Sequence, residues 1–499
     1  MSRRLGILGT AILLLFAVVA AQAVNIQYFR ASALNASGEN PRVSQSSTLY
    51  ARGRIVAADG TILAQSIPVS HGYYPWRRIY PLGSLTSAVV GFSSPSYGNW
   101  ALESQYSSVL GAHQQPPQNV EQILAPRSAA DSLTLTIEPV LQRIARKALA
   151  GQDGAAVVLD PRTGAVLAMY SNPGYNPVPL TSSVYSVASA AWKAYNTNDA
   201  HGFPPLGLVA TQQTFPPGST FKVVTTAAVV AGRPDLFNKS YPVVATISLP
   251  QSNQTLSNFG FVACGGTILQ MLPPSCDPGY ALLGLDIGGK LLAKTANSFG
   301  YNMVPPIDLP GVQPSYFPPA ASFLTNLPGV AYSAIGQQNV RATALQNALV
   351  AAGIANGGVI MTPHLMAYIT APDGAIVKRY QPKAWLHPLT SAQASKIVPL
   401  MVDVARYGTA YGVFPAADDV GAKTGTAQTG NSAKNTDDWM IAFAPATSPT
   451  IAVAVVVPFQ NITGTGAAVA GPIMRCLVEG ALALQSGHPA TGTSTTCQS

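Results

Sequence analysis

The distribution of apolar residues along the chain shows one long uninterrupted apolar segment near the start. Leu5 to Val24 contains no charged residue and follows Arg3 and Arg4. About twenty apolar residues are enough for an α-helix to cross a bilayer, and the basic flank predicts that the short tail stays on the cytoplasmic side. We therefore expect a membrane anchor over residues 1–24 and export of everything after it. Small residues at Ala21-Gln22-Ala23 also fit signal-peptide cleavage, so retention of the anchor stays open.

The next hundred residues have a different pattern. Between residues 25 and 130, short apolar runs alternate with stretches rich in Gly, Pro, Ser and Gln, and no long helical periodicity is visible. Short apolar runs bounded by such residues are typical of strands and turns. We expect a small pedestal domain, rich in loops and strands, over 25–130.

From residue 131 the pattern predicts an α+β domain. Two pairs of apolar runs, each joined by a Pro-containing turn, predict β-hairpins, and helical spacing dominates between them. The predicted elements are a strand at 132–137, a helix at 138–150, hairpins at 155–170 and 439–457, and a final helix at 467–484. We expect one domain over 131–485, with a sheet assembled from both of its ends and a helical insertion between them. Residues 486–499 are rich in Ser, Thr and Gly and are expected to form a flexible tail.

Charge is scarce throughout the chain. Charged residues make up 10% of the sequence, against roughly 25% in soluble proteins, and 28 basic residues face 20 acidic ones, for a net charge of +8. This balance fits either anionic surroundings, such as cell-wall polymers or lipid headgroups, or life in an acidic medium that would protonate carboxylates. The basic residues are scattered, so nucleic acid is not an expected partner.

The four cysteines do not have the spacing of a metal or redox site, because none forms a CxxC pair. We expect neither a metal nor another cofactor. Cys264 and Cys276 lie twelve residues apart, and in an exported chain they could form a disulfide or remain as two free thiols.

One motif has the residues of a nucleophile and its base. Ser219 to Lys222 reads Ser-Thr-Phe-Lys, follows a Pro-Pro-Gly turn and precedes a run of apolar residues, which predicts that a buried helix begins near Ser219. Residues three apart share a helix face, and the helix start favours developing negative charge. Burial would lower the pKa of Lys222, so that its amine could accept the serine proton. The alternative is a serine N-cap followed by a surface lysine.

Two further motifs follow in the sequence. Ser275-Cys276-Asp277 is a Ser-x-Asp motif, and Lys423-Thr424-Gly425-Thr426 lies just before the second predicted hairpin, where it reads as a strand edge. Each alone would be an ordinary turn or loop. Together, and in this order, the three motifs are the set found in penicillin-binding proteins and class A β-lactamases.

On these motifs, the chain resembles class B penicillin-binding proteins, in particular the actinobacterial penicillin-binding protein A group. The resemblance extends to Tyr332–Gln337, between the second and third motifs, to Arg52–Ile55 after the anchor, and to Ala101–Glu103 in the pedestal. It covers the chain from Arg52 to Leu484. It implies the α+β transpeptidase fold related to serine β-lactamases, with a central antiparallel sheet flanked by helices and an all-helical subdomain. The pedestal domain and a single N-terminal transmembrane helix would precede it.

The resemblance also implies roles for the motif residues. Ser219 would be the acylated nucleophile and Lys222 its general base, while Ser275 would pass a proton to the leaving amine. Lys423 would hold the substrate carboxylate, and the backbone N–H groups of Ser219 and Thr426 would form an oxyanion hole. The expected site residues are Ser219, Lys222, Ser275, Asp277 and Lys423 for catalysis, and Thr424, Gly425 and Thr426 for substrate binding.

Asp277 departs from the family pattern, which usually has Asn at this position. An ionised Asp cannot donate the hydrogen bond that an amide donates. We hypothesise that Asp277 instead pairs with Lys222 or Lys423 and changes their pKa values.

The function implied is D,D-transpeptidation of peptidoglycan stem peptides through an acyl-enzyme, with trapping by β-lactam antibiotics. A carboxypeptidase or a β-lactamase with the same motifs is one alternative, and a non-catalytic lactam sensor or scaffold is another. The anchor, the pedestal and the long gap between the second and third motifs favour the transpeptidase. The resemblance further implies a single-pass cell-membrane protein with its catalytic domain outside. Its expected partner is a polytopic lipid II polymerase, a SEDS-type glycosyltransferase.

Overall fold

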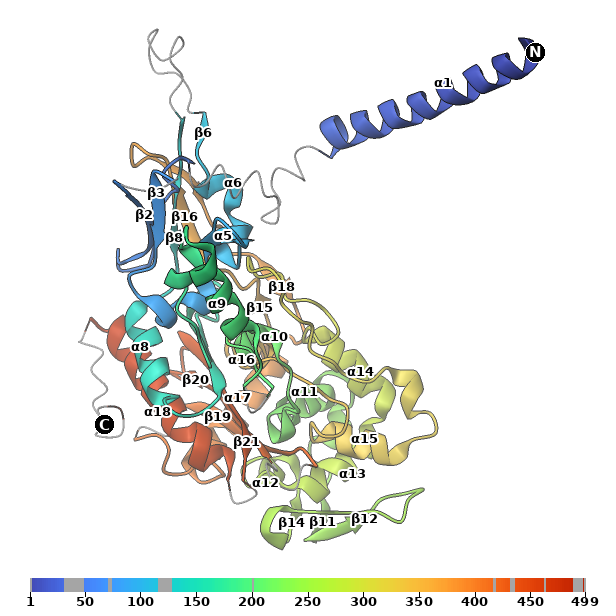
Figure 1. Ribbon diagram of the computed structural model, residues 1–499. Coiled ribbons are helices and arrows are strands. Elements are labelled where there is room, and N and C mark those ends of the chain that lie inside the picture. Colours follow the sequence, from blue (N-terminus) through green and yellow to red (C-terminus); the bar gives the residue numbers. More distant parts are fainter. Residues whose placement is uncertain are drawn as a thin grey trace.

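The computed structural model describes residues 2–30, 49–70, 74–114, 128–199, 202–415, 419–430, 436–461, 464–487 and 497. The N-terminal helix α1 (Ser2–Val24) continues through a short π-helix, Asn25–Phe29, and projects away from the rest of the molecule (Figure 1). Gly6–Phe29 has a mean hydropathy of 2.4 and is 0% buried, so its apolar side chains take no part in the core of the described chain. Its length and composition suit a membrane span.

A six-stranded sheet lies in the pedestal, but only β1, β2 and β3 come from residues 25–130; β8, β16 and β17 belong to the range 131–485 that was expected to form the catalytic domain. The strand order is β17-β16-β8-β1-β2-β3. These strands are β1 (Ile55–Val56), β2 (Ile62–Pro68), β3 (Trp76–Ile79), β8 (Ser132–Leu135), β16 (Met366–Thr370) and β17 (Ile376–Arg379). Neighbours pair antiparallel except β1 and β8, which are parallel. The small elements beside this sheet are α4 (Ser87–Val90), α5 (Leu102–Gln105), α6 (Ser107–Leu110), and the pairs β4/β5 (Ser93–Ser94, Gly98–Asn99) and β6/β7 (His113–Gln114, Ser128–Ala129).

A buried charged cluster holds the pedestal together. Glu103 is fully buried, and its two carboxylate oxygens lie 2.5 Å from Arg52 Nε and 2.6 Å from Arg78 Nε. Burial on its own would raise the pKa of Glu103, but the two guanidinium groups bring it below its ordinary value. Removing one partner from such a buried set leaves an uncompensated charge, which destabilises a fold strongly.

The second sheet has five antiparallel strands in the order β10-β9-β21-β20-β19. They are β9 (Gly154–Leu159), β10 (Val166–Asn172), β19 (Gly421–Gln428), β20 (Thr436–Ala444) and β21 (Ile451–Gln460). Both predicted hairpins are present, and β21 pairs with β9, so the two ends of the domain meet at the sheet centre. Helices α8 (Pro139–Ala148) and α18 (Gly466–Gln485) pack together beside this sheet, and α16 (Ala344–Ala355) packs on β9, β20 and β21. The strands are apolar on both sides because helices cover both faces.

The remaining helices form the predicted insertion (Figure 1). They are α9 (Tyr185–Asn196), α10 (Val209–Gln212), α11 (Lys222–Gly232), α12 (Ile268–Met271), α13 (Asp277–Ile287), α14 (Gly289–Ser298), α15 (Leu327–Ala334) and α17 (Ser391–Arg406). Three short strand pairs accompany them: β11/β14 (Tyr241–Val244, Cys264–Gly266), β12/β13 (Thr246–Ser248, Thr255–Ser257) and β15/β18 (Ile360–Met361, Ala384–Leu386).

Two disulfides close loops in this domain. Cys264 on β14 is bonded to Cys276, so the disulfide alternative holds for this pair. Cys476 on α18 is bonded to Cys497, a link that the sequence analysis did not anticipate. The remainder of the expected flexible tail, residues 488–496 and 498–499, lies outside the described residues.

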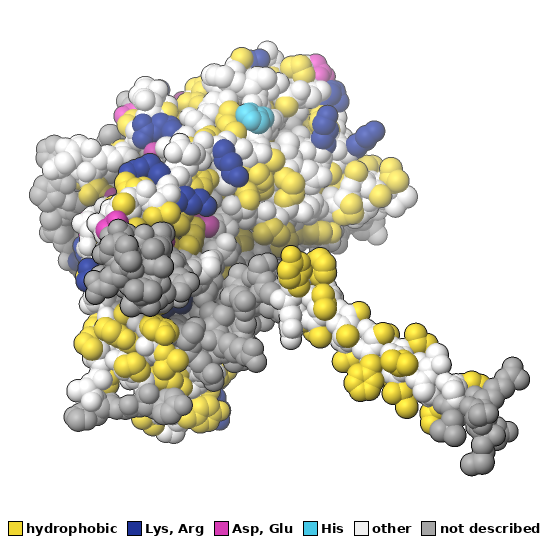
Figure 2. Space-filling model, turned by 90° about the horizontal axis from the view of Figure 1, so that it is seen from above, with side chains coloured by type: hydrophobic (Ala, Val, Ile, Leu, Met, Phe, Trp, Pro, Cys, Tyr) yellow, Lys and Arg dark blue, Asp and Glu magenta, His cyan; other side chains and the backbone are white. Residues whose placement is uncertain are grey.

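The face seen in Figure 2 shows the low charge of the sequence. Its charged side chains are scattered among yellow apolar side chains and white areas, which are the backbone and the remaining side chains, and the outward side chains of α1 are largely apolar. Charged side chains therefore cover only a small part of this face.

Candidate active site

The turn before Ser219 is fixed by close backbone packing. Ser219 and Lys222 stand at the junction between a 3-10 turn, Gly218–Phe221, and the buried helix α11, as the sequence predicted. Gly218 donates its N–H to the Gly336 carbonyl at 3.0 Å. Gly336 has φ +73°, and a Cβ there would lie 2.1 Å from the Gly218 carbonyl oxygen. This explains why the Tyr332–Gln337 stretch contains glycine at this point: it holds the nucleophile turn in place.

Lys222 is fully buried and points toward the second motif. Its ammonium donates to the Ser275 carbonyl oxygen at 2.7 Å and to Asp277 Oδ1 at 2.7 Å, and lies 3.2 Å from Ser275 Oγ. Within the described chain, Ser219 Oγ has no hydrogen-bond partner, so Lys222 is directed to Ser275 and Asp277 in this state. Catalytic hydrogen bonds are often formed only once substrate is bound.

Ser275 lies between the two lysines. Its hydroxyl accepts from Lys423 Nζ at 2.9 Å as well as from Lys222. Ser275 has φ +60°, which is uncommon for a residue other than glycine. The conformation is held by the Cys264–Cys276 disulfide and by a bond from the Asp277 N–H to Asn258 Oδ1. Strained residues that are held this firmly cluster at functional sites.

Burial weakens the ammonium forms of both lysines. It lowers the pKa of Lys222, although the Asp277 carboxylate opposes this shift. Burial, together with repulsion from Lys222, lowers the pKa of Lys423 well below its ordinary value. Two ammonium groups that share one hydroxyl repel each other, so the site favours a state in which one of the two amines is neutral. A neutral amine here can accept a proton.

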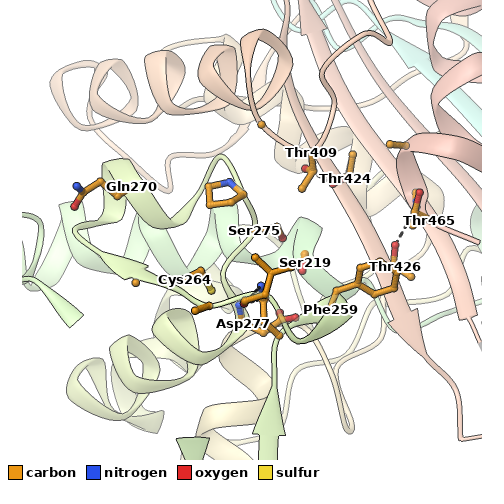
Figure 3. A pocket seen from close by; sticks show the side chains of 18 of the residues that line it. Ser219, Phe259, Cys264, Gln270, Ser275, Asp277, Thr409, Thr424, Thr426 and Thr465 are labelled. Carbon is orange, nitrogen blue, oxygen red and sulfur yellow. Dashed lines mark hydrogen bonds between the residues drawn. The ribbon is translucent and has the colours of Figure 1, made fainter. Parts of the chain in front are cut away.

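The third motif lies on β19, the edge strand of the five-stranded sheet, beside the nucleophile turn. A Cβ at Gly425 would lie 2.7 Å from the Pro217 carbonyl oxygen, so only glycine allows this approach of strand and turn. Thr426 Oγ1 accepts from the Gly466 N–H at 2.9 Å, and Thr426 lies beside Thr465 (Figure 3). The motif therefore faces Ser219 across a short gap.

Thr409 also belongs to the site, although it lies in none of the three sequence motifs and was not among the predicted site residues. Its hydroxyl lies 2.6 Å from that of Thr424, and its N–H donates to the Pro273 carbonyl at 2.9 Å. Thr409 thus connects the segment before the second motif to the third motif (Figure 3). A lone Thr in a loop after a helix has no sequence signal that would identify it.

The motifs open onto a cavity of about 680 Å³. Its floor contains Ser219, Ser275 and Asp277, and one wall contains Thr409, Thr424 and Thr426 (Figure 3). Val243, Phe259 and Val262 from the β11–β14 region form an apolar rim. Among the described residues, no group of three or more His, Cys, Asp or Glu is placed to hold a metal ion.

All eight predicted site residues come together, from segments more than two hundred positions apart in the sequence, and Asp277 pairs with Lys222 rather than with Lys423. The arrangement supplies a half-buried hydroxyl, two buried amines with lowered pKa values, and a wall of hydroxyl groups for an anion. Chemically, it suits attack of a serine on an acyl group beside a carboxylate.

The comparisons with known proteins agree with this chemistry. Residues 154–479 match the penicillin binding protein transpeptidase domain, and residues 52–129 match the penicillin binding protein A dimerisation domain. The chain is 32% identical to the peptidoglycan D,D-transpeptidase PbpA of Mycobacterium tuberculosis, covering 95% of this chain and 98% of that protein. It is 34% identical to PbpA of Mycolicibacterium smegmatis, covering 95% and 97% respectively.

A solved structure of penicillin-binding protein A from M. tuberculosis, as the penicillin G acyl-enzyme complex, superposes with a TM-score of 0.78. The identity is 32%, and the match covers 87% of this chain and 99% of that one. The similarity therefore includes a protein that was captured with a β-lactam as an acyl-enzyme.

Proposed function

The chain belongs to the penicillin-binding protein transpeptidases, and on this basis we propose that Ser219 is the residue through which it acts. The protein is a serine D,D-transpeptidase that cross-links peptidoglycan and is acylated by β-lactams. The observation that supports Ser219 is its position: a half-buried hydroxyl at the start of α11, in the cavity shared by all three motifs.

In the acylation step, Ser219 Oγ attacks the carbonyl carbon between the two D-Ala residues of a donor stem peptide. The serine proton passes to the neutral Lys222 amine, and the negative charge on the carbonyl oxygen is met by the backbone N–H groups of Ser219 and Thr426. Because Ser275 bonds to both lysines, it can pass a proton to the nitrogen of the departing D-Ala. Thr424 and Thr409 provide hydroxyl groups for the terminal carboxylate.

In the second step, an amine of a neighbouring stem peptide attacks the acyl-enzyme. The new amide bond forms as the Ser219 ester bond breaks, the amine loses a proton to the Lys222–Ser275 network, and the network returns a proton to Ser219 Oγ. Such a covalent intermediate predicts ping-pong kinetics. The apolar rim of the cavity would keep water away from the ester and so favour the amine over hydrolysis.

The N-terminal helix and the pedestal indicate where the protein lies in the cell and which partner it binds. We assign α1 as a retained single-pass anchor with the catalytic domain outside the cell membrane, because Gly6–Phe29 has a mean hydropathy of 2.4 and none of it is buried. The pedestal would then lie near the membrane, where a polytopic lipid II polymerase of the SEDS type could bind it together with α1.

The test is intact mass after incubation of the detergent-solubilised protein with benzylpenicillin. Wild type should gain the mass of the drug and lose it slowly, and Ser219→Ala should gain nothing. Ser240→Ala, at an exposed position outside the cavity, is the matched control and should behave as wild type. Labelling of Ser219→Ala would contradict the assignment of the nucleophile, and rapid loss of the adduct would indicate a β-lactamase.

A further inference from the structure

Behind the third motif lies a buried carboxyl group that the mechanism above does not use. Asp438 on β20 is 0% exposed, and neither of its carboxyl oxygens has a hydrogen-bond partner within the described chain. A buried carboxyl group without partners is costly, and natural proteins keep few of them. Its retention in a catalytic sheet therefore needs an explanation.

The position of Asp438 is directly behind Thr426. The two residues are cross-strand partners in the β19–β20 pair. The carboxyl group also abuts the segment that follows β21, since a Cβ at Gly464 would lie 2.7 Å from Asp438 Oδ2. The same segment supplies the Gly466 N–H that bonds to Thr426 Oγ1. Asp438 thus lies next to Thr426, which lines the cavity, and next to Gly464, two residues before the Gly466 N–H that bonds to Thr426.

We propose that Asp438 is a positioning residue for the transpeptidase reaction, and that acylation requires its neutral form. This inference rests on the proposed function. An ionised Asp438 would place a negative charge behind Thr426, close to two groups that are themselves negative in the reaction. It would also attract the Thr426 hydroxyl hydrogen away from the substrate. A neutral Asp438 neither repels the negative groups of the reaction nor competes with the substrate for the Thr426 hydroxyl hydrogen.

The groups around Asp438 determine the pH at which its carboxyl group ionises. Burial raises the pKa of Asp438 to about 7, and the Asp437 carboxyl adds to the rise. The neighbouring Thr426 hydroxyl is near enough to oppose this rise, although it does not reach hydrogen-bond geometry with either Asp438 oxygen. The positive charge of Arg341 lowers the pKa of Asp437, against the larger rise that burial causes. On β19, Lys423 is directed to Ser275, and on β21 the partner is the apolar Val457. In the segment after β21, Gly464 abuts Asp438, and none of Gly464 to Ala467 has a titratable side chain.

The experiment measures the second-order rate constant for acylation by a fluorescent penicillin between pH 5.5 and 9. In wild type we expect a fall of about tenfold, with a midpoint near pH 7, as Asp438 ionises. Asp438→Asn keeps the shape of the side chain without the charge, so its profile should lack this fall. Asp437→Asn should keep the fall but move it to lower pH, because a neutral neighbour lets Asp438 ionise more easily.

An unchanged alkaline limb in Asp438→Asn would overturn the proposal. If that variant does not fold, the profile of Asp437→Asn decides: a midpoint at lower pH supports the proposal, and an unmoved midpoint overturns it. A merely structural role for Asp438 would change the rate at all pH values and leave the midpoint in place, which also contradicts the proposal. Absence of labelling of wild type at every pH would instead contradict the proposed function itself.

Discussion

The ammonium group of Lys222 lies 2.7 Å from the carboxylate of Asp277, the residue that replaces the usual Asn of the second motif. Lys222 is fully buried, whereas the side chain of Asp277 is 23% exposed at the cavity floor. Asp277 therefore supplies a counter-charge to a lysine that burial would otherwise push toward its neutral form. This pair is the chain's main departure from the family pattern, and it has a direct kinetic consequence.

Asp277→Asn should shift the acid limb of the acylation profile to lower pH. The Asp277 carboxylate raises the pKa of Lys222, so its removal lowers that pKa further, and the neutral amine becomes available at lower pH. The measurement is the acylation rate as a function of pH below the pH of its maximum. Asp235→Asn breaks an exposed pair with Arg233 and is the control. Identical acid limbs in Asp277→Asn and wild type would rule out this role.

Thr409→Val should reduce acylation efficiency by about tenfold, because it removes one of the two hydroxyl groups that lie 2.6 Å apart at the carboxylate wall. Thr409→Ser keeps the hydroxyl and should restore most of the rate. The comparison of KM and kcat with a thioester substrate locates the loss: a binding role raises KM. If valine and threonine gave equal efficiencies, Thr409 would have only a packing role.

Removal of the Cys264–Cys276 disulfide should affect both stability and acylation. A double Ala variant opens a loop of twelve residues, and we expect a loss on the order of 2 to 3 kcal/mol in the free energy of unfolding. Because Cys276 lies between Ser275 and Asp277, the acylation rate should fall as well. The control is the double Ala variant of Cys476 and Cys497, which should lose stability but keep its acylation rate. Equal acylation in both double variants would mean that the first disulfide does not position the motif.

Gly336→Ala should largely prevent acylation. A Cβ at Gly336 would lie 2.1 Å from the Gly218 carbonyl oxygen, so the nucleophile turn would have to move. Gly374→Ala is a matched control, because Gly374 also has a positive φ but has nothing within 4 Å of a Cβ. Both variants carry backbone strain of about 1 kcal/mol, and only the first should lose labelling by penicillin. Loss of labelling in both would point to strain rather than to contact with the turn.

Stability should fall as pH rises from about 4 to about 7. Burial raises the pKa of Asp437 to about 6 and that of Asp438 to about 7, whereas in the unfolded chain both would titrate near 4. Over this window the folded state holds more protons, so the free energy of unfolding decreases with pH, by on the order of 3 kcal/mol for Asp438. Thermal unfolding at pH 4.5 and pH 8 measures this. Asp438→Asn should reduce the difference between the melting temperatures at pH 4.5 and pH 8. An unchanged difference would contradict the raised pKa of Asp438 in the folded state.

Much of this architecture can be predicted from the sequence because periodicity and motif order are local signals. Apolar runs identified both hairpins of the second sheet, and the Pro-Pro-Gly turn before Ser219 identified the start of a buried helix. The three motifs predicted a shared site because the family pattern requires it. The side chains that contact them through space, such as Thr409 and Asp438, carry no such pattern.

Other features could not be predicted because they depend on tertiary contacts. The partner of Asp277 was left open between Lys222 and Lys423, and only the fold around Ser275 decides it. The Cys476–Cys497 link joins a helix to a tail with no strand or motif beside it. The pairing of β8 with β16 joins segments more than two hundred residues apart, and short strands give weak signals for distant pairing.

The mixed origin of the pedestal sheet has a consequence for anyone who would cut this protein into parts. The chain leaves the pedestal after β8, builds the helices around the nucleophile, returns to add β16 and β17, and leaves again. A fragment that begins at residue 139 would expose the edge of β16 that β8 normally covers, and such open edges promote aggregation. The pedestal sheet is thus completed by strands that lie beyond the nucleophile in the sequence, so no single cut in the chain separates the pedestal from the catalytic part.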